Sequence, residues 1–160
     1  MQPLLTLVPV GLAVIAAGCG SSSPSKTASY AQSRTITRSM AKVGTRHTSL
    51  GSVLVDARGR TLYLFENDRG TASRCYGSCA SVWPPLTTAA MPVAGRGALA
   101  SKLGSGERTD GKRIVTYSGH PLYTYAGDGK AGDVHGQGAD QFGAEWYALS
   151  PDGRKIDSDR

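Results

Sequence analysis

A six-residue pattern that occurs twice constrains the fold of this chain more than any other feature. The pattern is a tyrosine, any residue, an aromatic residue, two further residues and an aspartate, and it spans residues 63–68 and 123–128. In both copies a leucine stands directly before the tyrosine, and a glycine stands four positions before it. Self-similarity at a fixed spacing indicates an internal repeat. We therefore expect two related units.

Each copy lies in a segment that reads as a β-hairpin. In the first, the β-branched run 52–55 is followed by the turn signal Asp56-Ala57-Arg58-Gly59 and by a second apolar run at 61–65. In the second, residues 113–117 and 122–125 flank a turn at 118–121. Short apolar runs separated by such turn residues predict antiparallel hairpins.

The first motif strand is apolar on both faces. Side chains alternate along a strand, so Tyr63 and Phe65 share one face while Leu62 and Leu64 share the other. A strand that is apolar on both faces is expected to be central and covered on both sides.

These patterns predict an all-β fold of antiparallel hairpins, as a single domain over residues 49–158 built from two pseudo-repeats. The chain has 21 glycines and 8 prolines, and no window shows sustained helical periodicity of apolar residues. We expect the repeats at about 49–100 and 108–158. Units of about 55 residues would each be only marginally stable, so the copies should pack against each other.

The N-terminus has the features of an export signal. Residues 2–18 are almost wholly apolar or small, a run too short for the roughly 20 residues of a membrane-spanning helix. We interpret residues 1–18 as a signal peptide. The sequence Ala16-Ala17-Gly18-Cys19 resembles a bacterial lipobox, which implies that Cys19 is acylated and becomes the mature N-terminus. The alternative is a chain without a lipid, with a chance cysteine at this position.

Residues 19–48 are predicted to be a flexible, lipid-anchored tether, because they contain few large apolar side chains. The net charge of +6 is concentrated around this segment, and residues 19–50 contain no acid. The basic residues either contact lipid headgroups or cell-wall polymers, or only keep the linker soluble. We expect no nucleic-acid partner, since the rest of the chain is nearly neutral and shows no basic stripe with interleaved aromatic residues.

Cys75 and Cys79 are the remaining cysteines. Exported proteins oxidise paired thiols, so a structural disulfide is the first expectation. The alternative is a redox or copper(I) site, because thiolates are soft metal ligands and closely spaced cysteines can cycle between oxidation states.

The other candidate site residues belong to or accompany the motif. Asp68 and Asp128 are expected to be structural turn residues, with paired catalytic carboxylates or a calcium site as alternatives. The aromatic residues are expected to form a core shared by the repeats, or else a cleft that stacks on a ligand: Tyr63, Phe65, Trp83, Tyr123, Tyr125 and Trp146. His47, His120 and His135 lack zinc-site spacing. We expect no metal, no cofactor and no catalytic constellation.

The motif, the Cys75–Cys79 block with the following Trp83-Pro84-Pro85-Leu86, and Trp146-Tyr147 resemble a bacterial family of predicted lipoproteins, the secreted repeats of unknown function. The resemblance covers residues 48–150 and implies export and anchoring, but no activity. We expect an uncharacterised, non-catalytic binding or structural domain that is lipid-anchored on the extracytoplasmic face of the cell membrane. Possible partners are cell-wall or envelope components. The alternative is an envelope redox or copper-handling protein that uses Cys75 and Cys79.

Overall fold

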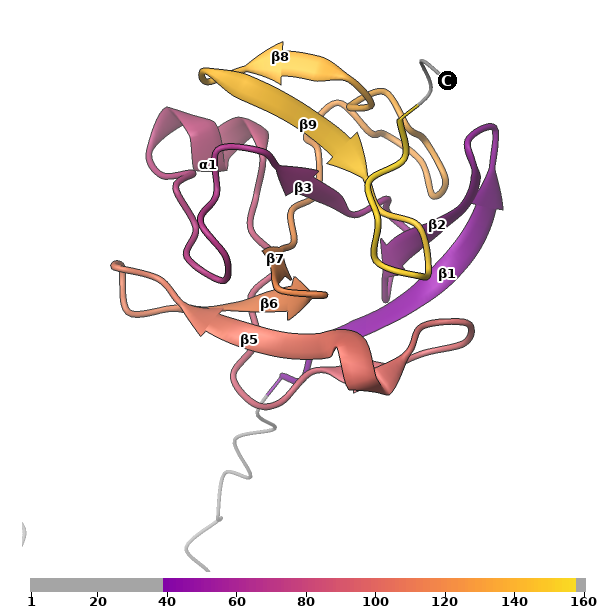
Figure 1. Cartoon of the computed structure of the whole chain (residues 1–160), viewed down its shortest axis with the longest axis horizontal. Helices are drawn as coiled ribbons and strands as arrows, with labels where there is room; N and C mark the ends of the chain where they lie inside the picture. The colour runs from indigo at the N-terminus through magenta and orange to yellow at the C-terminus, as the bar shows by residue number, and fades with distance from the viewer. Residues whose placement is uncertain (1–38, 158–160) are drawn as a thin grey trace, which may run out of the picture. The chain divides into compact units, whose positions relative to one another are not determined.

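The structure is a computed structural model that describes residues 39–157, which form an all-β domain (Figure 1). The expected signal peptide, Cys19 and most of the expected tether lie outside the described residues. The elements are β1 (Lys42–Thr48), β2 (Gly51–Asp56), β3 (Tyr63–Phe65), α1 (Ser78–Val82), β4 (Val93–Ala94), a 3-10 helix (Ala100–Lys102), β5 (Leu103–Glu107), β6 (Arg113–Tyr117), β7 (His120–Pro121), β8 (Ala139–Gln141) and β9 (Ala144–Ala148).

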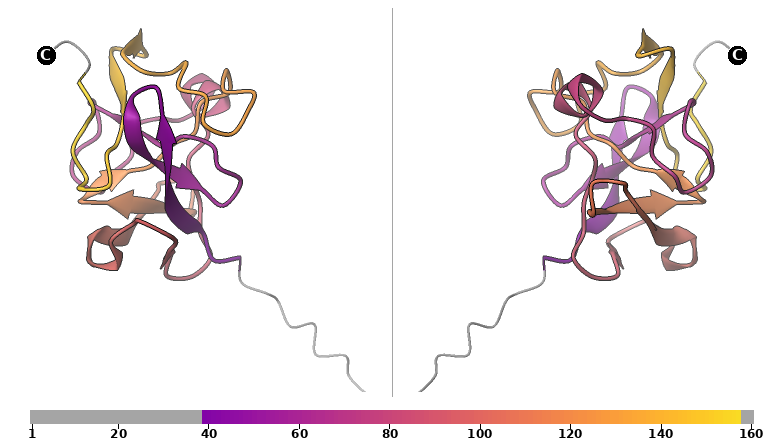
Figure 2. Two further views of the ribbon diagram at one scale, coloured as in Figure 1. Left: turned by 90° about the vertical axis from the view of Figure 1, so that its right-hand side faces the viewer. Right: turned by 90° about the vertical axis from the view of Figure 1, so that its left-hand side faces the viewer.

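The strands form small sheets in the orders β2-β1-β4, β3-β9-β8 and β5-β6-β7. In Figure 1, β8 and β9 lie above β3, while β5 and β6 lie below it. Figure 2 shows the β1–β2 hairpin from the side. The pairings are antiparallel except that β1 runs parallel to β4. The all-β fold with two repeats is therefore confirmed, with one parallel contact added.

Both repeats begin one strand earlier than the sequence suggested. β1 pairs with β2, and β5 pairs with β6 in the same way. The expected tether ended at residue 48, which was wrong for its last part because β1 occupies Lys42–Thr48. The repeat starts at 49 and 108 were likewise too late. Both first strands contain few large apolar side chains, so no hydrophobic alternation marks them.

The predicted hairpin between residues 52–55 and 61–65 forms only at its turn. The turn is closed by the Gly59 amide, which donates to the Asp56 carbonyl at 3.0 Å, and Gly59 has a φ of +80° that favours glycine. Beyond the Leu62 amide, which donates to the Leu54 carbonyl at 2.9 Å, the chain leaves β2. β2 pairs along its length with β1, and β3 pairs with β9.

The two repeats exchange the strands that follow their motifs. Residues 83–86 follow the first motif but pair with the second, where the Leu86 amide donates to the Leu122 carbonyl at 2.8 Å. β9 follows the second motif but pairs with the first, and beyond its end the Leu149 amide donates to the Leu62 carbonyl at 3.3 Å. Each repeat therefore completes the sheet of the other.

The core has two layers on opposite faces of β3. One cluster is aromatic and contains Tyr63 and Phe65, and the other is rich in leucine and contains Leu62 and Leu64. All four side chains are buried, as the alternating pattern predicted. β3 is central because β9 and the second motif strand flank its two edges, and the two clusters cover its faces.

Candidate functional site

The two motifs pair with each other at their tyrosines. The Tyr63 amide donates to the Tyr123 carbonyl at 2.8 Å, and the Tyr123 amide donates to the Tyr63 carbonyl at 3.0 Å. Two residues that exchange both bonds across an antiparallel ladder place their side chains on the same face. Both phenol rings accordingly enter the aromatic cluster.

Each tyrosine hydroxyl then reaches the aspartate of the other motif. The Tyr63 hydroxyl donates to Asp128 Oδ2 at 2.7 Å, and the Tyr123 hydroxyl donates to Asp68 Oδ2 at 2.8 Å. The other carboxylate oxygens accept backbone amides, from Arg74 at 2.7 Å for Asp68 Oδ1 and from His135 at 2.9 Å for Asp128 Oδ1. The sequence suggested that these aspartates are turn residues. The structure shows that they also join the two repeats.

On the Asp68 side the network continues to a buried arginine. Ser73 Oγ lies 2.7 Å from the Tyr123 hydroxyl and accepts from Arg108 Nη1 at 2.6 Å. Arg108 is 5% exposed, and it also donates to the Cys75 carbonyl at 3.1 Å. Burial raises the pKa of Asp68 to about 6, although the Arg74 amide, the Tyr123 hydroxyl and the Arg108 charge oppose this shift.

On the Asp128 side a glycine-rich loop closes over the pair. The Gly136 amide donates to the Tyr63 hydroxyl at 3.3 Å, and His135 Nδ1 lies 3.5 Å from Asp128 Oδ1. Burial raises the pKa of the Asp128 carboxyl, and the hydrogen bond from Tyr63 opposes the shift. The hydroxyl pKa of Tyr63 is raised by its own burial, and then by the carboxylate beside it.

Four aromatic rings stack in one column through the cluster. Phe65 stacks on Trp146 with ring centroids 4.1 Å apart, Trp146 on Trp83 at 3.9 Å, and Trp83 on Tyr125 at 4.4 Å. Each motif therefore stacks on the tryptophan that follows the other motif. The indole N–H groups of both tryptophans donate to Gln141, one to its side chain at 2.9 Å and one to its carbonyl at 3.1 Å.

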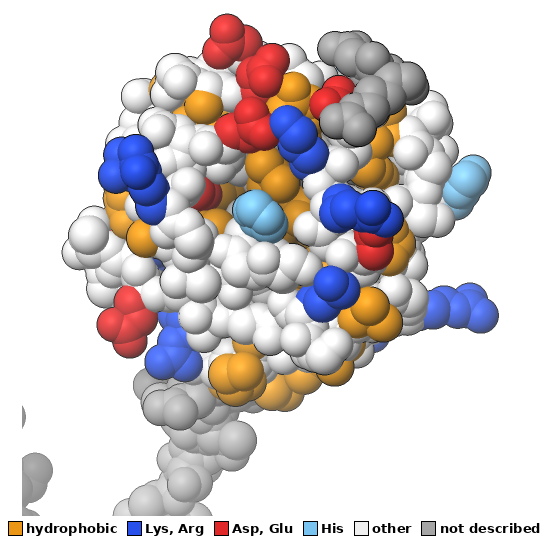
Figure 3. Space-filling model, in the orientation of Figure 1, with side chains coloured by type: hydrophobic (Ala, Val, Ile, Leu, Met, Phe, Trp, Pro, Cys, Tyr) orange, Lys and Arg blue, Asp and Glu red, His pale blue; other side chains and the backbone are white. Residues whose placement is uncertain are grey.

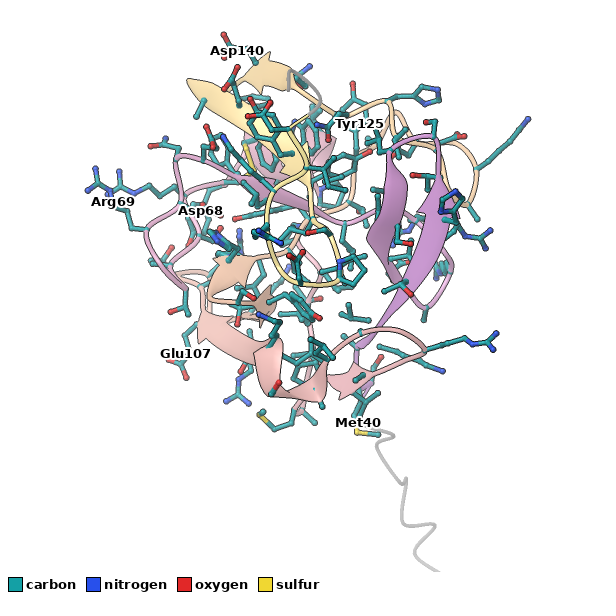
Figure 4. All side chains as sticks on the ribbon, turned by 45° about the vertical axis from the view of Figure 1, so that its right-hand side comes forward. Met40, Asp68, Arg69, Glu107, Tyr125 and Asp140 are labelled. Carbon is teal, nitrogen blue, oxygen red and sulfur yellow. A yellow bond between two sulfur atoms is a disulfide. The ribbon has the colours of Figure 1, made fainter. Side chains whose placement is uncertain are left out.

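The remaining motif tyrosines contact this column by their edges. Tyr63 meets Trp83 at 5.3 Å and Tyr123 meets Trp146 at 5.2 Å, both close to perpendicular. The structure thus brings the six aromatic candidates together with Asp68 and Asp128. Asp68 and Tyr125, both labelled in Figure 4, are the half-buried members of this set.

Cys75 and Cys79 form a disulfide, which confirms the first expectation for these residues. Their Cα atoms lie 5.2 Å apart, and the bridge joins the loop after the first motif to α1. Gly77 provides the turn between them with a φ of +55°. Cys75 is fully buried and Cys79 is 5% exposed, so the bridge faces the core and not the solvent.

An open groove lies beside the first motif and has a volume of about 1070 Å³. Leu64 and Phe65 contribute to its lining, together with Asp68, the turn after β6 and the C-terminal segment 150–157. At the rim, Lys155 Nζ contacts Glu66 Oε1 at 2.6 Å. Figure 3 shows a hollow on this face with hydrophobic side chains inside it and charged side chains around it.

The histidines do not assemble into a site. His47 lies on β1, His120 lies beside the groove, and His135 lies over Asp128 with its side chain 65% exposed. Within residues 39–157, no group of three or more histidine, cysteine or acidic side chains is arranged to hold a metal ion.

Sequence reasoning missed Ser73, Arg108 and Gln141, which satisfy the buried polar atoms of the cluster. They come from separate segments with no shared spacing. In the sequence, an arginine that follows a glycine-rich strand is expected to be an exposed turn residue. In the structure, Arg108 is buried because it donates to Ser73 and to the Cys75 carbonyl, which belong to the other repeat.

The fold and this cluster define a class: an all-β domain of two repeats that exchange strands around a shared aromatic centre. The chain belongs to the family of secreted repeats of unknown function, whose model matches residues 44–87 and 104–150, more than half of the sequence. Each matched segment runs from the first strand of a repeat to the exchanged strand. No curated protein and no solved structure matches the chain.

Family membership places the domain outside the cytoplasm, in the envelope or beyond it. In the part of the chain that the structure describes, no helix has the length and apolar character needed to cross a membrane.

Proposed function

We propose that the protein is a lipid-anchored, non-catalytic binding domain on the extracytoplasmic face of the cell membrane, and that its groove takes an envelope or cell-wall component. The observation that carries the binding role is the open groove of about 1070 Å³ next to the first motif. Its lining joins the apolar Leu64 and Phe65 to polar and charged residues, and polar groups of this kind fix the orientation of a ligand in its pocket.

The non-catalytic role rests on how the motif residues are used. Both aspartates accept hydrogen bonds at each of their oxygens, and both motif tyrosines are fully buried. A general acid or nucleophile needs access to a substrate within hydrogen-bond reach. These groups are instead committed to holding the two repeats together.

The binding role is tested by NMR titration of the protein with muropeptides released from the cell wall. Amide shifts should concentrate at Leu64, Phe65 and His120, and Arg154→Ala at the rim should weaken binding several-fold. Arg58→Ala, in the exposed turn after β2, is the charge-matched control and should bind as the wild type does. Shifts that are scattered over the surface, or equal losses in both variants, would reject the groove.

The lipid anchor rests on the sequence Ala16-Ala17-Gly18-Cys19. Two or more acyl chains hold a protein stably on a bilayer. Mass spectrometry of the protein extracted from its own membrane should show the acyl mass on Cys19, and Cys19→Ser should move the protein to the soluble fraction. A wild-type protein without added acyl mass would contradict the anchor.

A redox or copper-handling role for Cys75 and Cys79 is the second candidate, and thiol trapping separates it from the first. A buried structural bridge should resist mild thiol reductants in the native state, and Cys75→Ala/Cys79→Ala should lose about 2 kcal/mol of stability. Rapid alkylation of both cysteines in the native protein after mild reduction would favour the redox role instead.

A further inference from the structure

The aromatic column has a geometry suited to moving electrons as well as to packing. Its rings lie nearly parallel at Phe65–Trp146 and Trp146–Trp83, with interplanar angles of 9° and 5°, and tilted by 31° at Trp83–Tyr125. Indole and phenol are the side chains that lose a single electron most readily, and rings in contact exchange electrons quickly. The half-buried Tyr125 gives the column an end near the surface.

Each indole of the central pair touches a phenol that is hydrogen-bonded to a base. Tyr63 meets Trp83 and donates to Asp128, while Tyr123 meets Trp146 and donates to Asp68. A phenol that loses an electron must also release its proton, which requires an acceptor within hydrogen-bond reach. Both acceptors are in place, at 2.7 and 2.8 Å.

A buried tyrosine hydroxyl needs a hydrogen-bond acceptor, but that acceptor does not have to be a carboxylate. A backbone carbonyl satisfies a tyrosine hydroxyl in this same protein, where Tyr117 donates to the Pro151 carbonyl at 2.7 Å. A carbonyl cannot take up a proton at neutral pH, whereas a carboxylate can. Tyr63 and Tyr123, the two tyrosines that contact the tryptophan pair by their edges, both have carboxylate partners.

We propose that this cluster is a one-electron relay that accepts oxidising equivalents from radicals of the peroxyl class at the cell envelope. The radical receives one electron by way of the two indoles, across the Tyr125 ring, which keeps its proton and is not itself oxidised, and becomes a hydroperoxide anion. The electron comes from Tyr63 or Tyr123, whose O–H bond breaks to leave a neutral phenoxyl radical. The released proton passes to Oδ2 of Asp128 or Asp68. Solvent protonates the anion, so electrons and protons balance.

The relay is tested by pulse radiolysis of the full-length protein in detergent, with the azide radical as the oxidant of tryptophan. The transient absorption of the tryptophan radical should decay as that of the tyrosine radical grows, at a rate independent of protein concentration. Growth should be slower in deuterated water because the O–H bond breaks in the same step. A rate proportional to protein concentration, or one unchanged in deuterated water, would overturn the proposal.

Variants identify the proton acceptors. Asp68→Asn/Asp128→Asn keeps one oxygen on each side chain, enough to accept the hydroxyl hydrogen bond, but removes both bases, and should slow the growth of the tyrosine radical about a hundredfold, the order that a general base contributes. The control is Glu145→Gln, because Tyr147 donates to Glu145 Oε2 at 2.8 Å but belongs to the other core cluster. Equal rates in the double variant and the control would refute the relay. The isotope measurement on the wild type decides the question if the double variant does not fold.

Discussion

At the scale of single residues, the two Tyr–Asp pairs are the most demanding contacts in the domain. Asp128 is 8% exposed, and its carboxylate is held by one hydroxyl and one amide. A buried acceptor that loses its donor retains the cost of desolvation, which is larger than the net contribution of the bond itself. The pairs therefore make the domain sensitive to the loss of one oxygen atom.

Tyr63→Phe is expected to lower the free energy of unfolding by about 1–3 kcal/mol, because it leaves Asp128 Oδ2 without its donor and the Gly136 amide without its acceptor. Urea denaturation followed by tryptophan fluorescence measures the change. Tyr147→Phe is the matched control, since it removes a bond to the exposed Glu145 and should cost less than about 0.5 kcal/mol. Equal losses would mean that burial of the pair is energetically unimportant.

Asp68 should give stability a slope with pH. Its folded pKa of about 6 lies above the usual aspartate value of 3.8, so the folded state binds the proton more tightly than the unfolded state. The contribution of the Asp68 carboxyl to the free energy of unfolding is greatest below about pH 4. It decreases as the pH rises to about 6 and is constant above that. With allowance for partial exposure, the loss is about 1–2 kcal/mol.

Asp68→Asn should therefore flatten the pH dependence of the free energy of unfolding between about pH 4 and pH 6. Urea titrations at several pH values measure it. Asp152→Asn is the contrasting variant, because hydrogen bonds from Ser150 and Arg154 lower the pKa of the Asp152 carboxyl. The pH dependence that Asp152 contributes should appear below about pH 4, where its stabilisation is lost as the pH decreases, so the slope has the opposite sign to that of Asp68. An unchanged slope in Asp68→Asn would show that Asp68 ionises normally in the fold.

At the scale of elements, the glycine-rich loop between the second motif and β8 packs directly against the aromatic cluster. A Cβ added at Gly136 would lie 2.7 Å from Trp83 Cη2 and 3.0 Å from Tyr63 Cζ, whereas one at Gly129 would meet its nearest neighbour at 4.0 Å. Only the first glycine is therefore required by packing.

Gly136→Ala is expected to destabilise the domain by about 1–3 kcal/mol, because neither ring can move away within the stacked column. Gly129→Ala should change stability by less than about 0.5 kcal/mol. Thermal unfolding followed by near-ultraviolet circular dichroism measures both variants and also reports the tryptophan environment. Equal midpoints would mean that the loop adjusts without disturbing the column.

The elements also show how far sequence reasoning reaches. The alternation of Leu62, Tyr63, Leu64 and Phe65 predicted a strand covered on both faces, because periodicity records the burial of each face. It did not predict which strand lies beside it, since pairing depends on contacts far apart in the chain. Export together with one remaining pair of cysteines predicted the bridge between Cys75 and Cys79, which are close in the sequence. The exchange between Tyr63 and Asp128 is not local, and no short pattern encodes it.

At the scale of the whole domain, exchange of strands makes the repeats interdependent. Both core clusters draw on both repeats, and the strand that completes each motif sheet comes from the other copy. A half-domain would expose the edge of its motif strand and lose the stacked rings opposite it. Unlike the repeats of a solenoid, these copies are not successive units that each add stability along the chain.

Fragments that comprise residues 39–97 and 98–157 should each be unfolded alone, because neither contains the strand that its own motif pairs with. Mixed in equal amounts, they should recover the amide dispersion of the intact domain in NMR spectra. The uncut domain 39–157 is the control. A dispersed spectrum from either fragment alone would show that the exchange of strands is not required for folding.

The exchange of strands also bears on how such a chain arises and diverges. Two units that trade strands around a shared centre have the arrangement of a swapped homodimer whose halves have been joined in one gene. Once joined, the halves no longer have to be identical, and here one has the disulfide helix where the other has the glycine-rich loop. The reciprocal pairs limit this divergence, because the Tyr63 hydroxyl donates to Asp128 and the Tyr123 hydroxyl donates to Asp68. A change in one copy can be compensated only in the other, so the two halves are inherited as a unit.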